Sequence, residues 1–131
     1  MIEALGREHD GRASGMTLHE ETGRSLVAVS GEIDLAVRQE AGPLCQALSE
    51  RALPVVIDAR DVTFVDSAGM SVLVRIARDA EAGGYPVVLE HAPWMLKELL
   101  TITGIDRLLP FAEGEPVPQH PTSPPPDDGT A

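Results

Sequence analysis

Cysteine is nearly absent from this sequence of 131 residues: Cys45 is the only one, so no disulfide can form within the chain. A single unpaired cysteine is typical of a reducing compartment. No apolar run approaches the ~18 residues that a membrane-spanning helix needs. Residues 1–15 also lack the basic segment and apolar core of a secretory signal. These absences predict a cytoplasmic protein.

Basic residues are scarce as well, with 10 Lys and Arg against 21 Asp and Glu and a formal net charge of −11. Such a surface repels phosphate backbones and anionic headgroups, which predicts no nucleic-acid partner and no membrane partner. The sequence contains no Gly-x-x-x-x-Gly-Lys phosphate loop and no His, Cys, Asp or Glu set at metal-ligand spacing. We therefore predict neither a cofactor nor a bound metal.

Apolar residues, by contrast, make up 43% of the chain, enough for the core of one domain. Strand and helix patterns alternate along it, which predicts an α/β fold with parallel strand pairs. The predicted strands are residues 16–19 and 26–29, joined as a hairpin, and the buried triplets 55–57 and 87–89. The predicted helices are residues 35–48, 67–82 and 94–103.

Several single residues within these elements have specific predicted roles. Asp34 is either the cap of the helix that follows it or a partner contact. At Gly42-Pro43 that helix is either kinked or begins anew with Pro43 at its first position. Cys45 and Trp94 fall on apolar helical faces and are predicted to pack inward.

The two ends of the chain have a different composition from the middle. Residues 1–15 mix charge and glycine with few apolar side chains, which predicts a flexible leader. Residues 113–131 are rich in proline and acid, which predicts a disordered tail. The predicted domain therefore spans residues 16–112.

The central stretch leads from the buried strand 55–57 to the tetrad Asp66-Ser67-Ala68-Gly69. The strand is predicted to stop at Asp58, followed by a polar loop and a short apolar turn at 62–65. Helical spacing starts after Ser67, so this serine is predicted to cap a helix, at a position whose N–H groups and dipole would also favour a phosphate.

Serine is an ordinary cap, but the predicted loop before Ser67 has an unusual charge. Asp58, Asp61 and Asp66 crowd it, with only Arg60 to offset them. Like charges concentrated in a loop at the end of a buried strand favour a binding site over a purely structural loop.

Two motifs together resemble the STAS domain, the module of anti-sigma factor antagonists and of the cytoplasmic ends of sulphate transporters. The tetrad at 66–69 is similar to the family's Asp-Ser-(Ser, Thr or Ala)-Gly, and Gly31-Glu32-Ile33-Asp34 is similar to its Gly-Glu-Leu-Asp turn. The resemblance covers residues 16–112. It implies a STAS-like single domain with a mixed, mostly parallel sheet and helices mainly on one face.

The resemblance also implies a function, that of an anti-sigma factor antagonist. In the family, the serine of the tetrad is phosphorylated by the partner anti-sigma serine kinase, which here points to Ser67. The dephosphorylated form would bind that kinase and release a sigma factor, and a serine phosphatase would act on phosphorylated Ser67. The implied partner-binding residues are Asp34, Asp58, Asp66, Ser67 and Gly69.

Two alternative functions remain open. One is a non-phosphorylated STAS subunit of a larger assembly, such as a stress-signalling complex or a lipid-transport machine. The other is a small serine hydrolase, because Ser67-Ala68-Gly69 shares Ser-x-Gly with the nucleophile elbow. However, Val65 replaces the elbow's first glycine, and the only histidines after Ser67 are His91 and His120. We therefore predict no catalytic residue and no enzymatic activity.

Overall fold

Strands and helices alternate in the computed structural model, which describes residues 15–112. The sheet has the order β1-β2-β3-β4, with β1 antiparallel to β2 and the other neighbours parallel. This confirms the predicted mixed, mostly parallel sheet. The predicted tail and all of the predicted leader except Gly15 lie outside the described residues. The strands are β1 (Gly15–Glu21), β2 (Arg24–Ile33), β3 (Val55–Val65) and β4 (Val87–Glu90).

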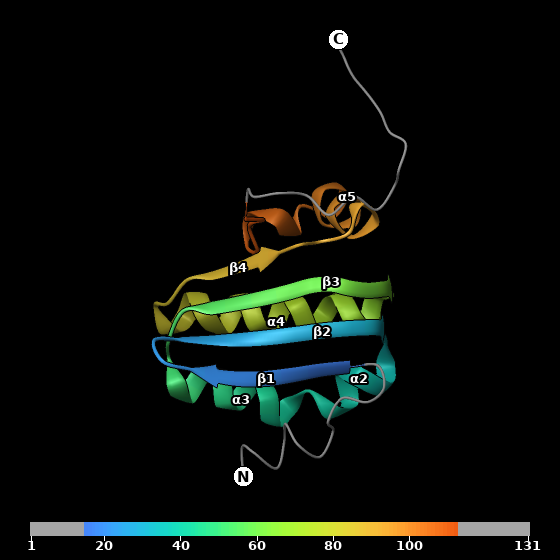
Figure 1. The fold of residues 1–131 in the computed structure, drawn as a ribbon. Coiled ribbons are helices and arrows are strands. Elements are labelled where there is room, and N and C mark those ends of the chain that lie inside the picture. The colour runs from blue at the N-terminus through green and yellow to red at the C-terminus, as the bar shows by residue number, and fades with distance from the viewer. Residues whose placement is uncertain (1–14, 113–131) are drawn as a thin grey trace.

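The helices lie mainly on one face of the sheet, as predicted. Figure 1 shows α2, α3 and α4 behind the strands, whereas α5 lies beyond β4. The predicted helix over 35–48 is two helices, and Pro43 occupies the first turn of the second one. The bounds are α2 (Leu35–Glu40), α3 (Gly42–Arg51), α4 (Ser67–Gly83) and α5 (Trp94–Thr103), followed by a 3₁₀ turn, η1 (Ile105–Arg107).

The core fills the space between the sheet and these helices. Val27 and Ile57 on the central strands are fully buried, as are Leu73 and Ile76 on α4. Cys45 on α3 is 1% exposed, and its burial raises the pKa of the thiol. A buried thiol with a raised pKa is poorly nucleophilic, so Cys45 is a core residue, as predicted.

The prediction that the central strand stops at Asp58 is wrong, because β3 continues to Val65. β4 pairs only with the first part of β3, and its last register partner is Glu90 opposite Asp58. Beyond that point one side of β3 has no β4 neighbour, so polar side chains are tolerated in the strand. The polar run is therefore a stretch of strand rather than a loop, with Arg60 and Asp61 exposed and Ala59 buried.

Two smaller predictions are also corrected. Gly31 does not begin a turn: β2 continues through it to Ile33, and its φ of 71° accompanies a register shift against β3. This is the conformational freedom that a β-bulge requires. Trp94 does not pack inward, since 57% of it is exposed, and Leu96 and Leu100 form the buried face of α5.

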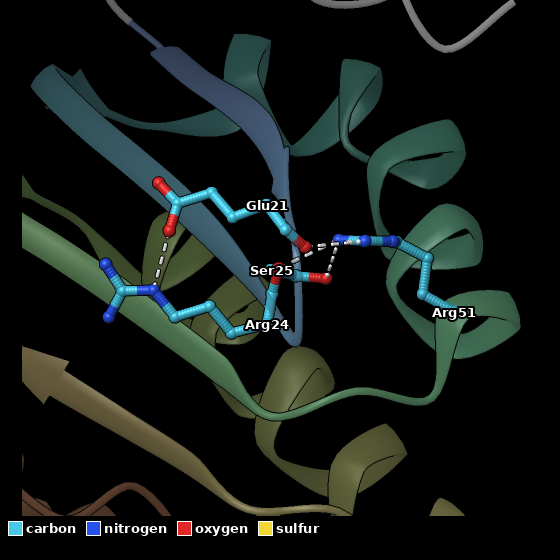
Figure 2. A network of polar contacts seen from close by, with 4 residues as sticks. All are labelled: Glu21, Arg24, Ser25 and Arg51. Carbon is cyan, nitrogen blue, oxygen red and sulfur yellow. Dashed lines mark hydrogen bonds and ion pairs between the residues drawn. The ribbon is translucent and has the colours of Figure 1, made fainter.

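One part-buried polar network joins the β1–β2 hairpin to the end of α3 (Figure 2). Arg51 donates to the carbonyl oxygens of Arg24 and Glu21 at 3.0 and 2.9 Å and to the hydroxyl of Ser25 at 2.9 Å. Ser25 is fully buried. Across the same turn, Arg24 Nε donates to the carboxylate of Glu21 at 2.7 Å. One guanidinium thus satisfies three acceptors and fixes the hairpin against α3.

We expect Arg51→Met to lower the free energy of unfolding by about 2–3 kcal/mol, because it leaves the buried hydroxyl of Ser25 and two part-buried carbonyl oxygens without this donor. Urea denaturation measures this as a lower midpoint with an unchanged m-value. Arg75→Met is the matched control, since it removes only the surface ion pair to Asp79 at 3.6 Å, worth about 0.5 kcal/mol or less. Equal midpoint shifts for the two variants would show that the network is not stabilising.

Candidate functional site

The candidate site is built from two strand-to-helix junctions that lie side by side. β2 and β3 end at the same level, with Ile33 opposite Val65 in the register. Neighbouring strands are about 5 Å apart, so the helices that follow also start close together. α2 and α4 are in contact, and Figure 1 shows α2 at the end of the sheet where β2 finishes.

Each junction is closed by an aspartate that caps the next helix. The carboxylate of Asp34 accepts from the backbone N–H of Val37 at 3.3 Å, and that of Asp66 accepts from Gly69 at 2.9 Å. Asp34 is therefore a cap, one of the two roles predicted for it. The cap of α4, in contrast, is Asp66 and not Ser67, which corrects the prediction by one residue.

Because Asp66 caps α4, the side chain of Ser67 is not needed as the helix cap. Ser67 is the exposed first residue of α4, and its hydroxyl forms no hydrogen bond with any residue in the range 15–112. Ser71, one turn later on the same helix, differs because its hydroxyl donates to the carbonyl of Ala68 at 2.6 Å. The oxygen of Ser67 is thus available to accept a group from another molecule.

Two opposing electrostatic influences would act on a negative charge at Ser67. The first N–H groups of the 17-residue helix α4 have no partner within the helix, and its dipole places partial positive charge at this end. Asp66 engages one of these groups, that of Gly69. The carboxylates of Asp34 and Asp66 add negative charge nearby. A phosphate on Ser67 would meet favourable backbone donors and unfavourable carboxylates together.

Gly69 sets how closely α4 approaches β2. It is buried, and a Cβ at this position would lie 2.7 Å from the carbonyl carbon of Ile33 and closer still to its oxygen. The backbone N–H of Asp66 donates to the same carbonyl oxygen at 3.3 Å. Gly69 therefore permits the close packing of α4 on the end of β2 and does not present a side chain to a partner.

The structure does not bring Asp58 to this site. Asp58 lies within β3, and the seven residues from it to Val65 separate it from the junction by roughly 20 Å. It is instead engaged by Arg60, whose Nε and backbone N–H donate to it at 3.2 and 3.1 Å. The hydrogen bond and charge of Asp58 raise the pKa of Arg60. Of the predicted contact residues, Asp34, Asp66, Ser67 and Gly69 are brought together.

Two large exposed apolar side chains, neither of them predicted as a contact, lie in the same chain segments as these four residues. Leu35 is 51% exposed and Phe64 is 52% exposed. For Leu35 the helical spacing is informative only once Val37 is known to be the buried residue of α2, because a position two residues away points to another side of a helix. For Phe64 the two-residue period of a strand is interrupted, because Thr63 and Phe64 are both exposed between the buried Val62 and Val65.

A STAS-family model, described as "Mlab, STAS domain", matches residues 16–110. The chain belongs to the STAS family. No helix of this STAS domain, within residues 15–112, is long and apolar enough to cross a membrane. The same residues contain no group of three or more His, Cys, Asp or Glu side chains that could hold a metal.

Solved structures with the same fold include an anti-sigma factor antagonist from Mycobacterium paratuberculosis, 24% identical, covering 73% of this chain and 82% of its own, with a TM-score of 0.59. The Bacillus cell fate determinant SpoIIAA in its phosphorylated form is 14% identical and covers 75% and 91%, with a TM-score of 0.60. The anti-sigma factor antagonist SpoIIAA in its unphosphorylated form is 15% identical and covers 75% and 88%, also with a TM-score of 0.60. At these identities the likeness establishes the fold.

Proposed function

We propose that this STAS domain is an anti-sigma factor antagonist and that Ser67 is the residue through which its partner, an anti-sigma serine kinase, controls it. The observation that carries the proposal is the exposed, unengaged hydroxyl of Ser67 at the start of α4, left free by the cap from Asp66. Two of the similar structures are named as antagonists, and SpoIIAA is named in both a phosphorylated and an unphosphorylated form.

The proposed switch is electrostatic. In the unmodified form, the surface around Ser67 binds the kinase, which then releases a sigma factor. Phosphorylation adds about −1.5 to −2 charges. The helix N-terminus tolerates this charge in the free protein, whereas a partner pressed against Ser67 would have to desolvate it. A serine phosphatase would restore the binding form, and the exchange would take place in the cytoplasm.

The chain itself catalyses no reaction under this proposal. Among the described residues, His19 is exposed on β1, and His91 faces Glu90 with 4.0 Å between Nε2 and Oε1. Neither forms a hydrogen bond with Ser67, so no described histidine activates this serine as a nucleophile. Ser67 is a substrate for another enzyme.

The direct test of the modification is incubation with purified anti-sigma serine kinases and Mg-ATP, followed by intact-mass and peptide mass spectrometry. We expect one phosphate on the wild type and on Ser71→Ala, and none on Ser67→Ala. Ser71 is the matched control because it is also exposed on the first turns of α4. Modification at Ser71 or Thr63, or no modification by any kinase, would refute the assignment.

A second candidate function is a STAS subunit of a larger assembly that is not phosphorylated, such as a stress-signalling complex or a lipid-transport machine. The observation in its favour is apolar exposure on α5, where Trp94 is 57% and Ile102 is 74% exposed. A helix beyond β4 with two large exposed apolar side chains is suited to protein contact. The same mass-spectrometry experiment separates the two functions.

A further inference from the structure

Resting on the proposed function, we infer that Leu35 and Phe64 are the apolar anchors of the kinase contact and that they flank Ser67. The matching surface of the kinase is then an apolar recess with basic residues at its rim. Single exposed apolar residues are common on protein surfaces, but two large ones, each about half exposed, lie at the end of the sheet where Ser67 begins α4.

Leu35 occupies the same place in its junction as Ser67 does in the neighbouring one. Ile33 and Val65 are opposite each other, Asp34 and Asp66 are the two caps, and the next residue in each chain segment is the first of its helix. Since the strands are about 5 Å apart, Leu35 and Ser67 start side by side. Leu35, which is 51% exposed, and the exposed Ser67 therefore begin neighbouring helices at the same end of the sheet.

Phe64 lies at the same end of the sheet, on the other face. It is opposite Glu32 in the register, one position before the pair of Ile33 and Val65. Successive strand residues point to opposite faces, and Val65 is buried toward the helices, so Phe64 points to the face that α4 does not cover. Leu35 at the start of α2 and Phe64 near the end of β3 thus lie at the end of the sheet where Ser67 begins α4.

The charges around the two anchors define the rim of the partner surface. Glu32, Asp34 and Asp66 form no ion pair with any other described residue. Arg38, the basic residue of α2, is therefore not paired with any of these three carboxylates. Carboxylates that have no ion-pair partner and surround an apolar centre are complementary to Lys and Arg residues around an apolar recess. A second copy of this chain fits poorly, because it would bring the same carboxylates face to face at a net charge of −11.

This arrangement gives the phosphate its effect. The basic residues of the partner are opposite the rim carboxylates, whereas Ser67 lies between the anchors and faces the apolar recess. A phosphate there is moved from water into apolar surroundings without a cation of its own.

The experiment measures binding to the kinase that phosphorylates Ser67, by calorimetric titration without ATP. We expect Leu35→Ser and Phe64→Ser each to raise Kd by about tenfold, and the double variant by about a hundredfold. Ile102→Ser is the matched control, because it removes an exposed apolar side chain on α5 and should change Kd by less than about twofold. Thermal midpoints should stay within about 2 °C, since all three residues are exposed.

Each outcome separates this inference from the function on which it rests. Wild-type affinity in both anchor variants would overturn the anchors while leaving the proposed function intact. Failure of the wild type to bind any kinase would overturn both. If the free wild type forms dimers by sedimentation and Leu35→Ser abolishes them, the occupant of the surface is a second copy and the inference is wrong. Loss of binding only in Ile102→Ser would move the contact to α5 and also overturn it.

Discussion

Gly69→Ala should lower the free energy of unfolding by about 3 kcal/mol or more, a large effect for one methyl group. The added Cβ would lie 2.7 Å from the carbonyl carbon of Ile33, inside the van der Waals distance. The obstacle is backbone at the end of a central strand, which cannot move without shifting the junction. To remove this steric overlap, α4 would have to move away from β2, which would break the hydrogen bond from the backbone N–H of Asp66 to the carbonyl oxygen of Ile33.

Gly42→Ala is the matched control for this variant. Gly42 is also a helical glycine, but a Cβ there would meet no atom within 4 Å. The helical preference of alanine is opposed here by Pro43, which restricts the residue before it, so we expect this change to alter stability by less than about 1 kcal/mol. Chemical denaturation of both variants provides the comparison. Similar stability of Gly69→Ala and Gly42→Ala would mean that the close approach of α4 to β2 is not a requirement of the fold.

Ser67→Asp should weaken binding to the kinase by at least about tenfold, whereas Ser67→Ala should bind within about twofold of the wild type. Aspartate introduces a charge that must be desolvated in the complex. It carries less charge than phosphoserine, so its effect should be smaller than that of phosphorylation. The melting temperature should hardly change, because a carboxylate at an exposed helix N-terminus is favourable.

Ser67→Asn controls for the size of the new side chain, since asparagine matches aspartate in shape without its charge. We expect its Kd to remain closer to that of the wild type than to that of Ser67→Asp. Equal weakening by both variants would attribute the effect to steric exclusion. Equal affinity of Ser67→Asp and wild type would remove the electrostatic basis of the switch.

The negative surroundings of Ser67 are not those that the sequence suggested. Asp58 and Asp61 were expected in the same loop, but both lie on β3, and Asp58 is already held by Arg60. The carboxylates at this end of the sheet are instead those of Asp66, its neighbour in the chain, and Asp34 at the adjacent junction. The phosphate therefore adds charge to the pair of helix caps.

The overall architecture could be predicted from the sequence because its main signals are local. The buried triplets 55–57 and 87–89 and the helical spacing after Ser67 fix the βαβ order, and the order fixes parallel pairing. The length of β3 could not be predicted in this way. Arg60 and Asp61 are acceptable in a strand only because β4 ends early, and the length of one strand is not visible in the sequence of another.

Only part of the site could be predicted, because the rest again depends on how distant parts of the chain pack. Serine and aspartate are both good caps, so the sequence of 66–67 alone does not say which residue caps α4. The choice follows from packing, because Gly69 must lie against Ile33 and its N–H then faces Asp66. The exposure of Leu35 and Phe64 depends on which face of the sheet is covered, which is a property of the folded chain.

The measurement that tests the account most directly is calorimetric titration of one kinase with Ser67-phosphorylated protein and with unmodified protein, in the same buffer and without ATP. We predict that phosphorylation raises Kd by at least about a hundredfold while the melting temperature of the free protein stays nearly constant. Equal Kd values for the two forms would contradict the proposed switch.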